Sequence, residues 1–80
     1  MLANYVVCQN SGLENRTISE IDWPNHCLLV AIQRGAEELI PKGKTTLLVG
    51  DLIVTLTDER DAASVNEKME ELCKEKYDIL

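Results

Sequence analysis

The sequence has no phenylalanine, one tryptophan and two tyrosines, so its core must be built mainly from leucine, isoleucine and valine. It has no apolar run near the roughly 18 residues of a membrane-spanning helix, and it begins without a basic leader, so we predict neither a transmembrane segment nor a signal peptide. Basic charge is scarce: 8 Lys and Arg stand against 14 Asp and Glu, for a net charge of −6. This balance argues against a nucleic-acid partner, because phosphates attract basic surfaces.

Cysteine is also sparse, and its arrangement excludes two classes of small protein. Cys8, Cys27 and Cys73 are odd in number and widely spaced, with no CxxC pair. A disulfide scaffold or a zinc site would show paired or closely spaced cysteines. We therefore expect a reducing, cytoplasmic setting and no bound metal. Eighty residues predict one small domain, residues 1–80, with a thin core.

Four segments favour β-structure. Residues 27–33 form the most apolar run, too short for a confident helix and rich in branched side chains. Residues 4–9 and 52–57 are further predicted strands. Residues 37–41 are predicted to return as a short strand after a hairpin turn at Gly35, since glycine tolerates the positive φ of such turns.

The alternation of side chains in the predicted strands indicates which faces are apolar. In residues 27–33 both faces are apolar, with Leu28, Val30 and Ile32 on one side and Cys27, Leu29 and Ala31 on the other. Such a strand is normally covered on both sides. In residues 52–57 one face holds Leu52, Val54 and Leu56, and the other holds Ile53, Thr55 and Thr57.

Two segments favour helix. Residues 13–21 space their apolar side chains as one or two helical turns would, and the chain before Pro24 then leaves the helical region. Residues 61–75 are predicted to form an amphipathic helix, with Asp58 or Asp61 at its N-terminus. Its apolar face contains Ala62, Val65, Met69, Leu72, Cys73 and Lys76. The fold class is therefore α+β: a small, mostly antiparallel β-sheet with a short N-terminal helical segment and one C-terminal amphipathic helix.

The turns between the strands have a specific chemistry. They contain Gly35, Pro41, Gly43, Gly50 and Asp51, and the Asp51 carboxylate is suited to accept backbone N–H groups within its turn. The strings CLLVAIQRG and ELIPKGKTTLLVGDLIVTLTDE, taken together, resemble the TrkA-C domain, the C-terminal half of the unit that regulates potassium conductance (RCK). The resemblance spans roughly residues 12–75. The matching positions are Ile32, Arg34, Gly35, Ile40, Pro41, Gly43, Thr45, Gly50 and Asp51.

The resemblance implies a cytoplasmic regulatory and dimerisation domain of an ion channel or transporter, without catalytic activity. Trp23-Pro24 and the Pro-Lys-Gly-Lys-Thr run at 41–45 look most like versions fused to ClC-type chloride channels or exchangers, with potassium or cation transport systems next. No GxGxxG run is present, so the nucleotide-binding half of the unit is missing. We therefore expect a fragment of a larger membrane transport protein.

The alternative is a sensor of a small ligand, a nucleotide or a cyclic dinucleotide that gates a transporter. Some TrkA-C domains resemble receptors for c-di-AMP, with polar and basic residues leading into the long strand. Here residues 22–28 offer no Arg or Lys, and Asp22 would repel a phosphate. The candidate ligand-binding residues are Asn25, His26, Arg34, Lys42 and Lys44.

No set of residues predicts an enzyme or a cofactor. His26 and Cys27 are neighbours, but adjacent residues on a strand point to opposite faces, so the imidazole and the thiol would not meet. No third orienting group is evident beside them. We therefore predict no catalytic residue and no cofactor.

The apolar strands predict a homodimer. A single helix can cover one face of a small sheet, and the polar N-terminal segment is too small to cover the other, so an aliphatic patch would stay exposed. A second copy can cover it with one self-complementary surface. The candidate interface residues are Leu29, Ala31 and Ile53, with Trp23 at the rim. A closed barrel would satisfy the same pattern in a monomer.

Overall fold

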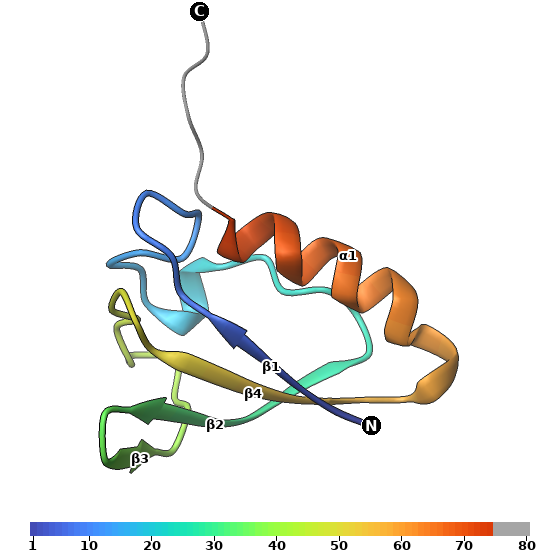
Figure 1. Ribbon diagram of the computed structural model, residues 1–80, viewed down its shortest axis with the longest axis horizontal. Coiled ribbons are helices and arrows are strands. Elements are labelled where there is room, and N and C mark those ends of the chain that lie inside the picture. Colours follow the sequence, from blue (N-terminus) through green and yellow to red (C-terminus); the bar gives the residue numbers. More distant parts are fainter. Residues whose placement is uncertain (75–80) are drawn as a thin grey trace, which may run out of the picture.

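The computed structural model describes residues 1–74. Four antiparallel strands form one sheet in the order β1-β4-β2-β3, and a single α-helix lies across one side of it (Figure 1). This architecture confirms the predicted α+β class. The elements are β1 (Leu2–Val6), η1 (Ile18–Glu20), β2 (Cys27–Arg34), β3 (Glu37–Leu39), β4 (Leu52–Thr57), η2 (Glu59–Asp61) and α1 (Ala62–Cys73), where η marks a short 3₁₀ turn.

Three of the four strands differ in their bounds from the prediction. β4 has the predicted bounds, and β2 extends one residue further, to Arg34. β1 lies earlier than residues 4–9, because its register with β4 pairs Leu2 with Leu56 and Val6 with Leu52. β3 ends at Leu39, before Pro41, which has no N–H to donate to a neighbouring strand.

The predicted short helical segment within residues 13–21 is present only as the single 3₁₀ turn η1. Asn15 has a left-handed backbone, with φ of 58°, which interrupts any helix. The neighbouring backbone groups bond sideways to residues 45–47: Asn15 N–H donates to Leu47 O at 2.9 Å, and Leu47 N–H donates to Arg16 O at 2.8 Å. These long-range bonds take the place of the local bonds that a helix would need.

The C-terminal helix is confirmed over its described part, with a start one residue later than predicted. Asp58 accepts a hydrogen bond from Arg60 N–H and so caps η2, which leads into α1. Val65, Met69 and Cys73 are buried on the predicted apolar face. The helix ends at Cys73, because Lys74 has an extended backbone, so the predicted end at residue 75 is two residues too late. Lys76 lies outside the described residues.

The predicted faces of β2 are partly wrong because of a β-bulge. Leu29 pairs with Thr55, but Ala31 then pairs with Val54, so the register shifts at Val30. A bulge adds one residue to one strand and resets its alternation. Ile32 therefore lies on the covered face, opposite the fully buried Ile53, instead of sharing a face with the exposed Leu28 and Val30.

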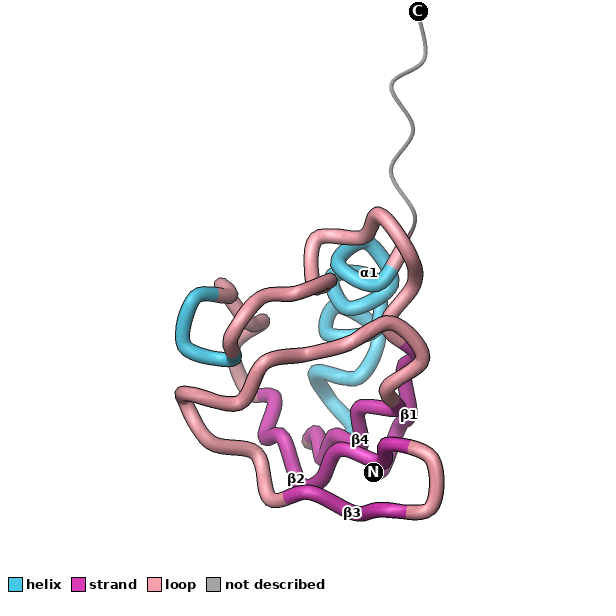
Figure 2. Tube along the Cα trace, turned by 90° about the vertical axis from the view of Figure 1, so that its left-hand side faces the viewer, coloured by secondary structure: helices cyan, strands magenta, loops and turns pink. Residues whose placement is uncertain are grey.

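The core lies between the sheet and α1. Figure 2 shows the helix and most of the loops on the same side of the four strands. Alternating residues of β1 and β4 point into this layer and meet the buried face of α1. The buried cluster comprises Tyr5, Val7, Leu13, Ile32, Leu47, Ile53, Val65, Met69 and Cys73.

The Gly50-Asp51 turn has the predicted chemistry and one further partner. Gly35 adopts a positive φ of 59°, as predicted, and Gly50 also adopts one, of 91°. The Asp51 carboxylate accepts the Leu48 N–H at 2.9 Å, and it also binds Arg34 through two hydrogen bonds of 2.9 and 2.7 Å. Arg34 also donates to the Thr46 carbonyl at 2.9 Å, so it fastens the end of β2 to this turn.

Burial on its own would raise the pKa of the Asp51 carboxyl. The hydrogen bonds from Arg34 and from the Leu48 N–H, together with the guanidinium charge, outweigh burial and hold that pKa below its ordinary value. Asp51 therefore stays ionised near neutral pH, and its charge is matched inside the fold.

Candidate functional site

A polar groove lies where the loop before β2 meets α1. It measures about 310 Å³ and is lined by Pro24, Asn25, His26, Ser64, Val65 and Lys68. That volume is at the lower end of the range for small-molecule sites, roughly 300–1,000 Å³. Two predicted ligand-binding residues, Asn25 and His26, thus share one concave surface with helix residues.

Local backbone geometry positions the loop side of this groove. Pro24 is buried, whereas Asn25 and His26 are exposed. His26 adopts a left-handed backbone with φ of 63°, which is uncommon for a residue other than glycine, although histidine tolerates it better than most. The turn at His26 directs the chain into β2 and leaves both side chains beside α1.

The groove presents several hydrogen-bond donors and one cation. Lys68 has an exposed ammonium group, and its nearest carboxylate is Asp22, at 3.6 Å on the surface. The Ser64 hydroxyl donates to Asp61 O at 3.1 Å and keeps its acceptor lone pairs. An amide, an imidazole, a hydroxyl and an ammonium together suit a small anionic or polar ligand.

The other three predicted ligand-binding residues lie elsewhere. Arg34 is engaged with Asp51, and seven strand steps of about 3.3 Å separate it from Cys27, so it lies roughly 23 Å from the groove. Lys42 and Lys44 are exposed in the turn after β3, where Lys42 N–H donates to the Thr45 hydroxyl at 3.2 Å. The structure therefore divides the predicted set among three places: the groove, the Arg34 end of β2, and the turn after β3, which bonds to Ser19 through Gly43 O.

Ser64 and Lys68 were missed by sequence reasoning. Both lie on α1, some forty positions after the loop that they face. In the sequence they read as ordinary solvated positions of an amphipathic helix. Only the packing of α1 against the loop before β2 brings them beside Asn25 and His26.

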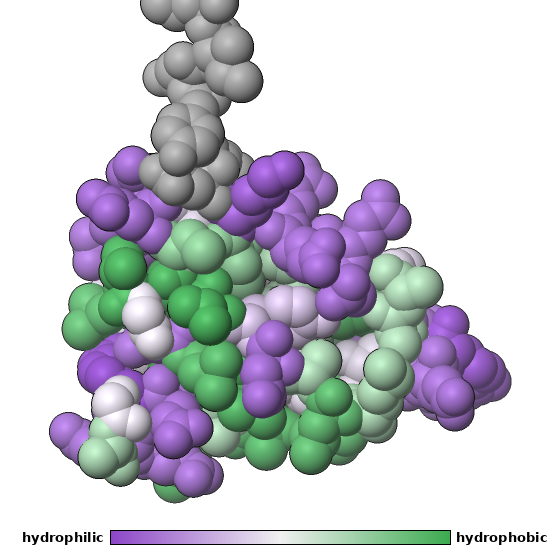
Figure 3. Space-filling view, viewed as in Figure 1, coloured by the Kyte–Doolittle hydropathy of each residue, from purple (hydrophilic) through white to green (hydrophobic). Residues whose placement is uncertain are grey.

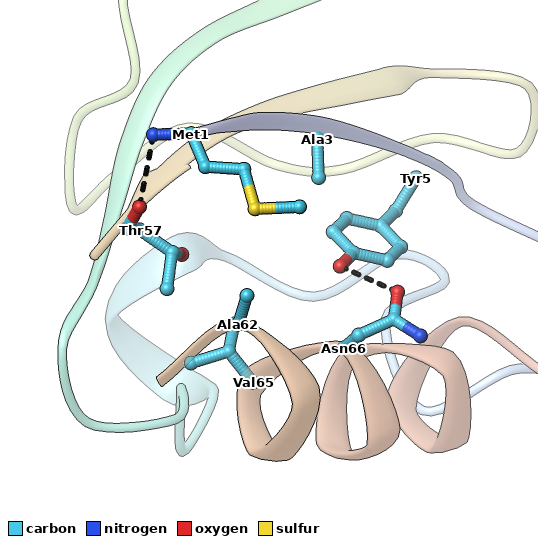
Figure 4. A pocket seen from close by; sticks show the side chains of 7 residues that line it. All are labelled: Met1, Ala3, Tyr5, Thr57, Ala62, Val65 and Asn66. Carbon is cyan, nitrogen blue, oxygen red and sulfur yellow. Dashed lines mark hydrogen bonds between the residues drawn. The ribbon is translucent and has the colours of Figure 1, made fainter. Parts of the chain in front are cut away.

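A second, smaller cavity lies between β1 and the start of α1 (Figure 4). Its volume is about 70 Å³, little more than the share of two water molecules in the liquid, so a nucleotide cannot enter it. Tyr5 closes one side by donating its hydroxyl proton to Asn66 Oδ1 at 2.9 Å. The buried Thr57 hydroxyl has no protein partner within the described chain.

The side of the sheet opposite α1 carries a row of apolar side chains. Among residues 1–74, no helix covers it (Figure 2). We call this the open face, and its exposed or half-buried members are Leu2, Val6, Leu28, Val30, Leu52, Val54 and Leu56. Figure 3 shows hydrophobic residues in the lower half of the molecule, where Figure 1 places the strands, and hydrophilic residues above them, where Figure 1 places α1.

The structure corrects the choice of interface residues. Ile53 is fully buried, and Leu29 packs against the core, so both lie on the helix-covered side. Trp23 is half-buried and donates its Nε1–H to Ile18 O at 3.0 Å. Ala31 pairs with Val54, on the side of the open face, but it is already buried, with 9% exposure. The dimer itself stays a prediction, and the surface available for it is the open face and its edges.

Two classes of site find no support in the part of the chain that the structure describes. Residues 1–74 contain no group of three or more His, Cys, Asp or Glu side chains placed to hold a metal ion. Burial raises the pKa of the Cys73 thiol to about 12, so this thiol is neutral and unreactive at pH 7.

The one α-helix within residues 1–74 is too short and too polar to cross a membrane.

Comparison with known proteins agrees with this geometry. A family model described as the TrkA-C domain matches residues 2–70, which include β1 and most of α1. A solved structure described as "Structure of RCK domain with cda" is 25% identical, with a TM-score of 0.72, and the match covers 89% of this chain and 96% of that chain. The chain belongs to the TrkA-C family, whose members are generally regulatory domains of ion-transport proteins.

Proposed function

We propose that this domain is the cytoplasmic regulatory and dimerisation module of a larger membrane transport protein. Residues 1–80 form its single domain, with the core of the family resemblance over residues 12–75. The open face is the observation that carries the proposal. A monomer rarely exposes a contiguous apolar patch larger than a few hundred Å², and here the apolar residues of three strands lie together on one uncovered side.

A second copy of the chain is the partner that explains this surface most simply. An isologous contact covers the patch of both copies with one self-complementary interface. Family membership supports the same partner, because RCK domains generally assemble as dimers. Dimerisation would let a change in one module act on two transport units at once.

A ClC-type chloride channel or exchanger is the parent that we favour, followed by a potassium or cation transport system. The support is the pair Trp23-Pro24 with the Pro-Lys-Gly-Lys-Thr turn. These two stretches lie at different places in the fold. Pro24 lines the polar groove, and the turn is bonded to η1, because the Gly43 carbonyl accepts a hydrogen bond from Ser19 N–H at 3.1 Å.

The test is ion flux in vesicles that contain the complete transport protein, intact or without residues 1–80. We expect flux to persist without the domain but at an altered rate, because a regulatory module does not form the pathway. Flux with an unchanged rate would contradict the proposal. Flux of chloride compared with potassium identifies the transported ion.

The groove supports a second function, the sensing of a small ligand. Its donors and the Lys68 ammonium suit a phosphate-bearing molecule, and the similar RCK domain was solved with a molecule named cda. Calorimetry with c-di-AMP and with ATP tests it. At about 100 times its Kd, a ligand adds roughly 2.7 kcal/mol to the free energy of unfolding, which a melting curve detects.

A pair of matched variants locates such a ligand. Lys68→Gln removes the groove cation, and Lys42→Gln removes an exposed cation from the turn after β3, which does not line the groove. We expect the first to weaken binding and the second to leave it unchanged. If both variants weaken binding equally, the nucleotide is attracted nonspecifically to positive charge. If neither c-di-AMP nor ATP gives heat with the wild-type protein, these nucleotides are not its ligands.

A further inference from the structure

The two edges of the sheet differ in their protection against pairing with another strand. β3 forms one edge, and it is three residues long, carries Glu37 and Glu38, and is followed by Pro41. Short length, charge and proline are the usual means by which an edge strand avoids another chain. β1 forms the other edge with the sequence LANYV, and it has none of these features.

The backbone of β1 shows which groups face outward from the sheet. Met1 exchanges two hydrogen bonds with Thr57, at 3.0 and 2.9 Å, and Val7 N–H donates to Asp51 O at 2.9 Å. Antiparallel pairing alternates, so the odd-numbered residues bond to β4 and the even-numbered ones point away from it. Three residues therefore present N–H and C=O groups at the free edge: Leu2, Asn4 and Val6.

These outward groups are accessible. Within residues 1–74, β4 is the strand that pairs with β1, and Val6 O receives in addition a long contact of 3.8 Å from the Cys8 thiol. A groove of about 460 Å³ runs beside the edge, between β1 and the end of α1. Its lining includes Asn4, Val6, Glu70 and Lys74, so α1 does not fill the space beside this edge.

The charge distribution favours a second copy at this edge. The protein carries a net charge of −6, yet no side chain before Glu14 is charged. Two copies that meet along β1 therefore bring uncharged strand side chains together, while the Met1 ammonium at the end of the strand stays bonded to Thr57 O. A two-fold axis at Asn4 pairs it with the partner's Asn4, and it pairs Leu2 with the partner's Val6. The contact then uses all three outward-bonding residues of each copy.

We infer that β1 pairs antiparallel with β1 of a second copy, which joins the two sheets into one of eight strands. This inference rests on the proposed dimerisation and specifies its contact. It differs from a face-to-face contact, because it leaves the open faces of both copies uncovered and joins them into one surface, to which Leu2 and Val6 contribute.

Light scattering over a series of concentrations tests the inference with Asn4→Pro. Proline removes an N–H group that bonds nothing within the protomer, and edge strands tolerate proline at such positions. Two intermolecular hydrogen bonds are lost per dimer, so we expect the dissociation constant to rise about tenfold or more. Leu28→Lys is the control. It places a charge on the open face, at a side chain that is 62% exposed, but β4 separates its strand, β2, from the β1 edge.

A charge swap keeps the test valid if Asn4→Pro does not fold. Asn4→Lys places two like charges directly opposite each other at the axis, which weakens pairing. Mixing the Asn4→Lys and Asn4→Glu chains should restore the dimer as a heterodimer. In the wild-type protein, amide exchange at Asn4 and Val6 should slow as concentration rises.

The outcomes separate the two proposals. A wild-type mass of 9.0 kDa at every concentration would contradict the proposed dimer itself. A dimer that survives Asn4→Pro and Asn4→Lys but dissociates in Leu28→Lys would overturn the edge contact and assign the open face instead. Loss of the dimer in the Asn4 variants alone, with recovery in the mixture, supports the edge.

Discussion

The two faces of the sheet are built from the same strands and are similarly apolar, but they differ in what covers them. On β4, Ile53 points to α1 and is fully buried, whereas Leu56 points the other way and is 43% exposed. The covered face supplies the free energy of folding. The open face contributes little to the protomer, so its apolar character is better explained by contact with a partner.

The largest expected effect separates the two faces directly. Ile53→Ala should lower the free energy of unfolding by about 2–5 kcal/mol, because it leaves a cavity in the core. Leu56→Ala on the same strand should cost under about 1 kcal/mol. Urea unfolding measures both. Equal losses would mean that the open face is packed within the protomer.

The next effect concerns the ion pair that fastens β2 to the turn before β4. Arg34→Met leaves the buried Asp51 carboxylate without its charged partner. The Arg34 side chain is 35% exposed, so we expect the free energy of unfolding to fall by about 2–3 kcal/mol. This is less than the loss expected when one partner of a fully buried pair is removed. Urea unfolding at pH 7 measures this loss, and an unchanged midpoint would show that the pair is not needed.

The same pair predicts a pH dependence. The folded-state pKa of Asp51 lies below its ordinary value of 3.8. Its contribution is therefore complete well above pH 3.8 and is lost as the pH falls through the lower folded-state pKa. The wild-type protein should lose stability on acidification below about pH 4, and Asp51→Asn should lose less over the same interval. Parallel acid curves for the two proteins would contradict this assignment.

A smaller effect concerns Gly50, whose turn determines which residues of β4 face α1. Its φ of 91° disfavours any side chain, although an added Cβ would meet no atom within 4 Å. Gly50→Val should therefore lower the free energy of unfolding by about 1–2 kcal/mol, through backbone strain alone. Gly43→Ala is the matched control, because its φ is not in the positive range and its Cβ would lie 3.5 Å from Ser19 Cβ, an ordinary contact. A urea midpoint that does not change in Gly50→Val would refute the strain.

The smallest expected effect is on the open face of the sheet. Leu28→Lys on the open face should change the free energy of unfolding of the isolated protomer by no more than about 0.5 kcal/mol. Thermal melting at high dilution measures it. A large loss would mean that Leu28 packs within its own protomer.

The sequence was sufficient to predict those features of the fold that depend on a residue and its near neighbours. The alternation in β4, the apolar face of α1 and the positive φ of Gly35 are of this kind. The prediction failed where distant segments decide. The bulge at Val30 depends on the register with β4, and residues 13–17 are held by bonds to residues 45–47.

The candidate site shows the same limit. Asn25 and His26 were chosen for their position before the long strand, and they do line a groove. Its other side, Ser64 and Lys68, depends on how α1 packs, which no local pattern contains. Arg34 was predicted to bind a ligand, but it binds Asp51, which lies 17 positions away, and the sequence holds several other carboxylates that could equally have paired with it.

The central claim is that the chain forms a dimer through a surface that the protomer leaves free, either the open face or the β1 edge. Light scattering of residues 1–80 at micromolar and higher concentrations tests it most directly. The account predicts a mass that rises with concentration toward twice 9.0 kDa, about 18 kDa. A mass that stays at 9.0 kDa throughout would contradict it.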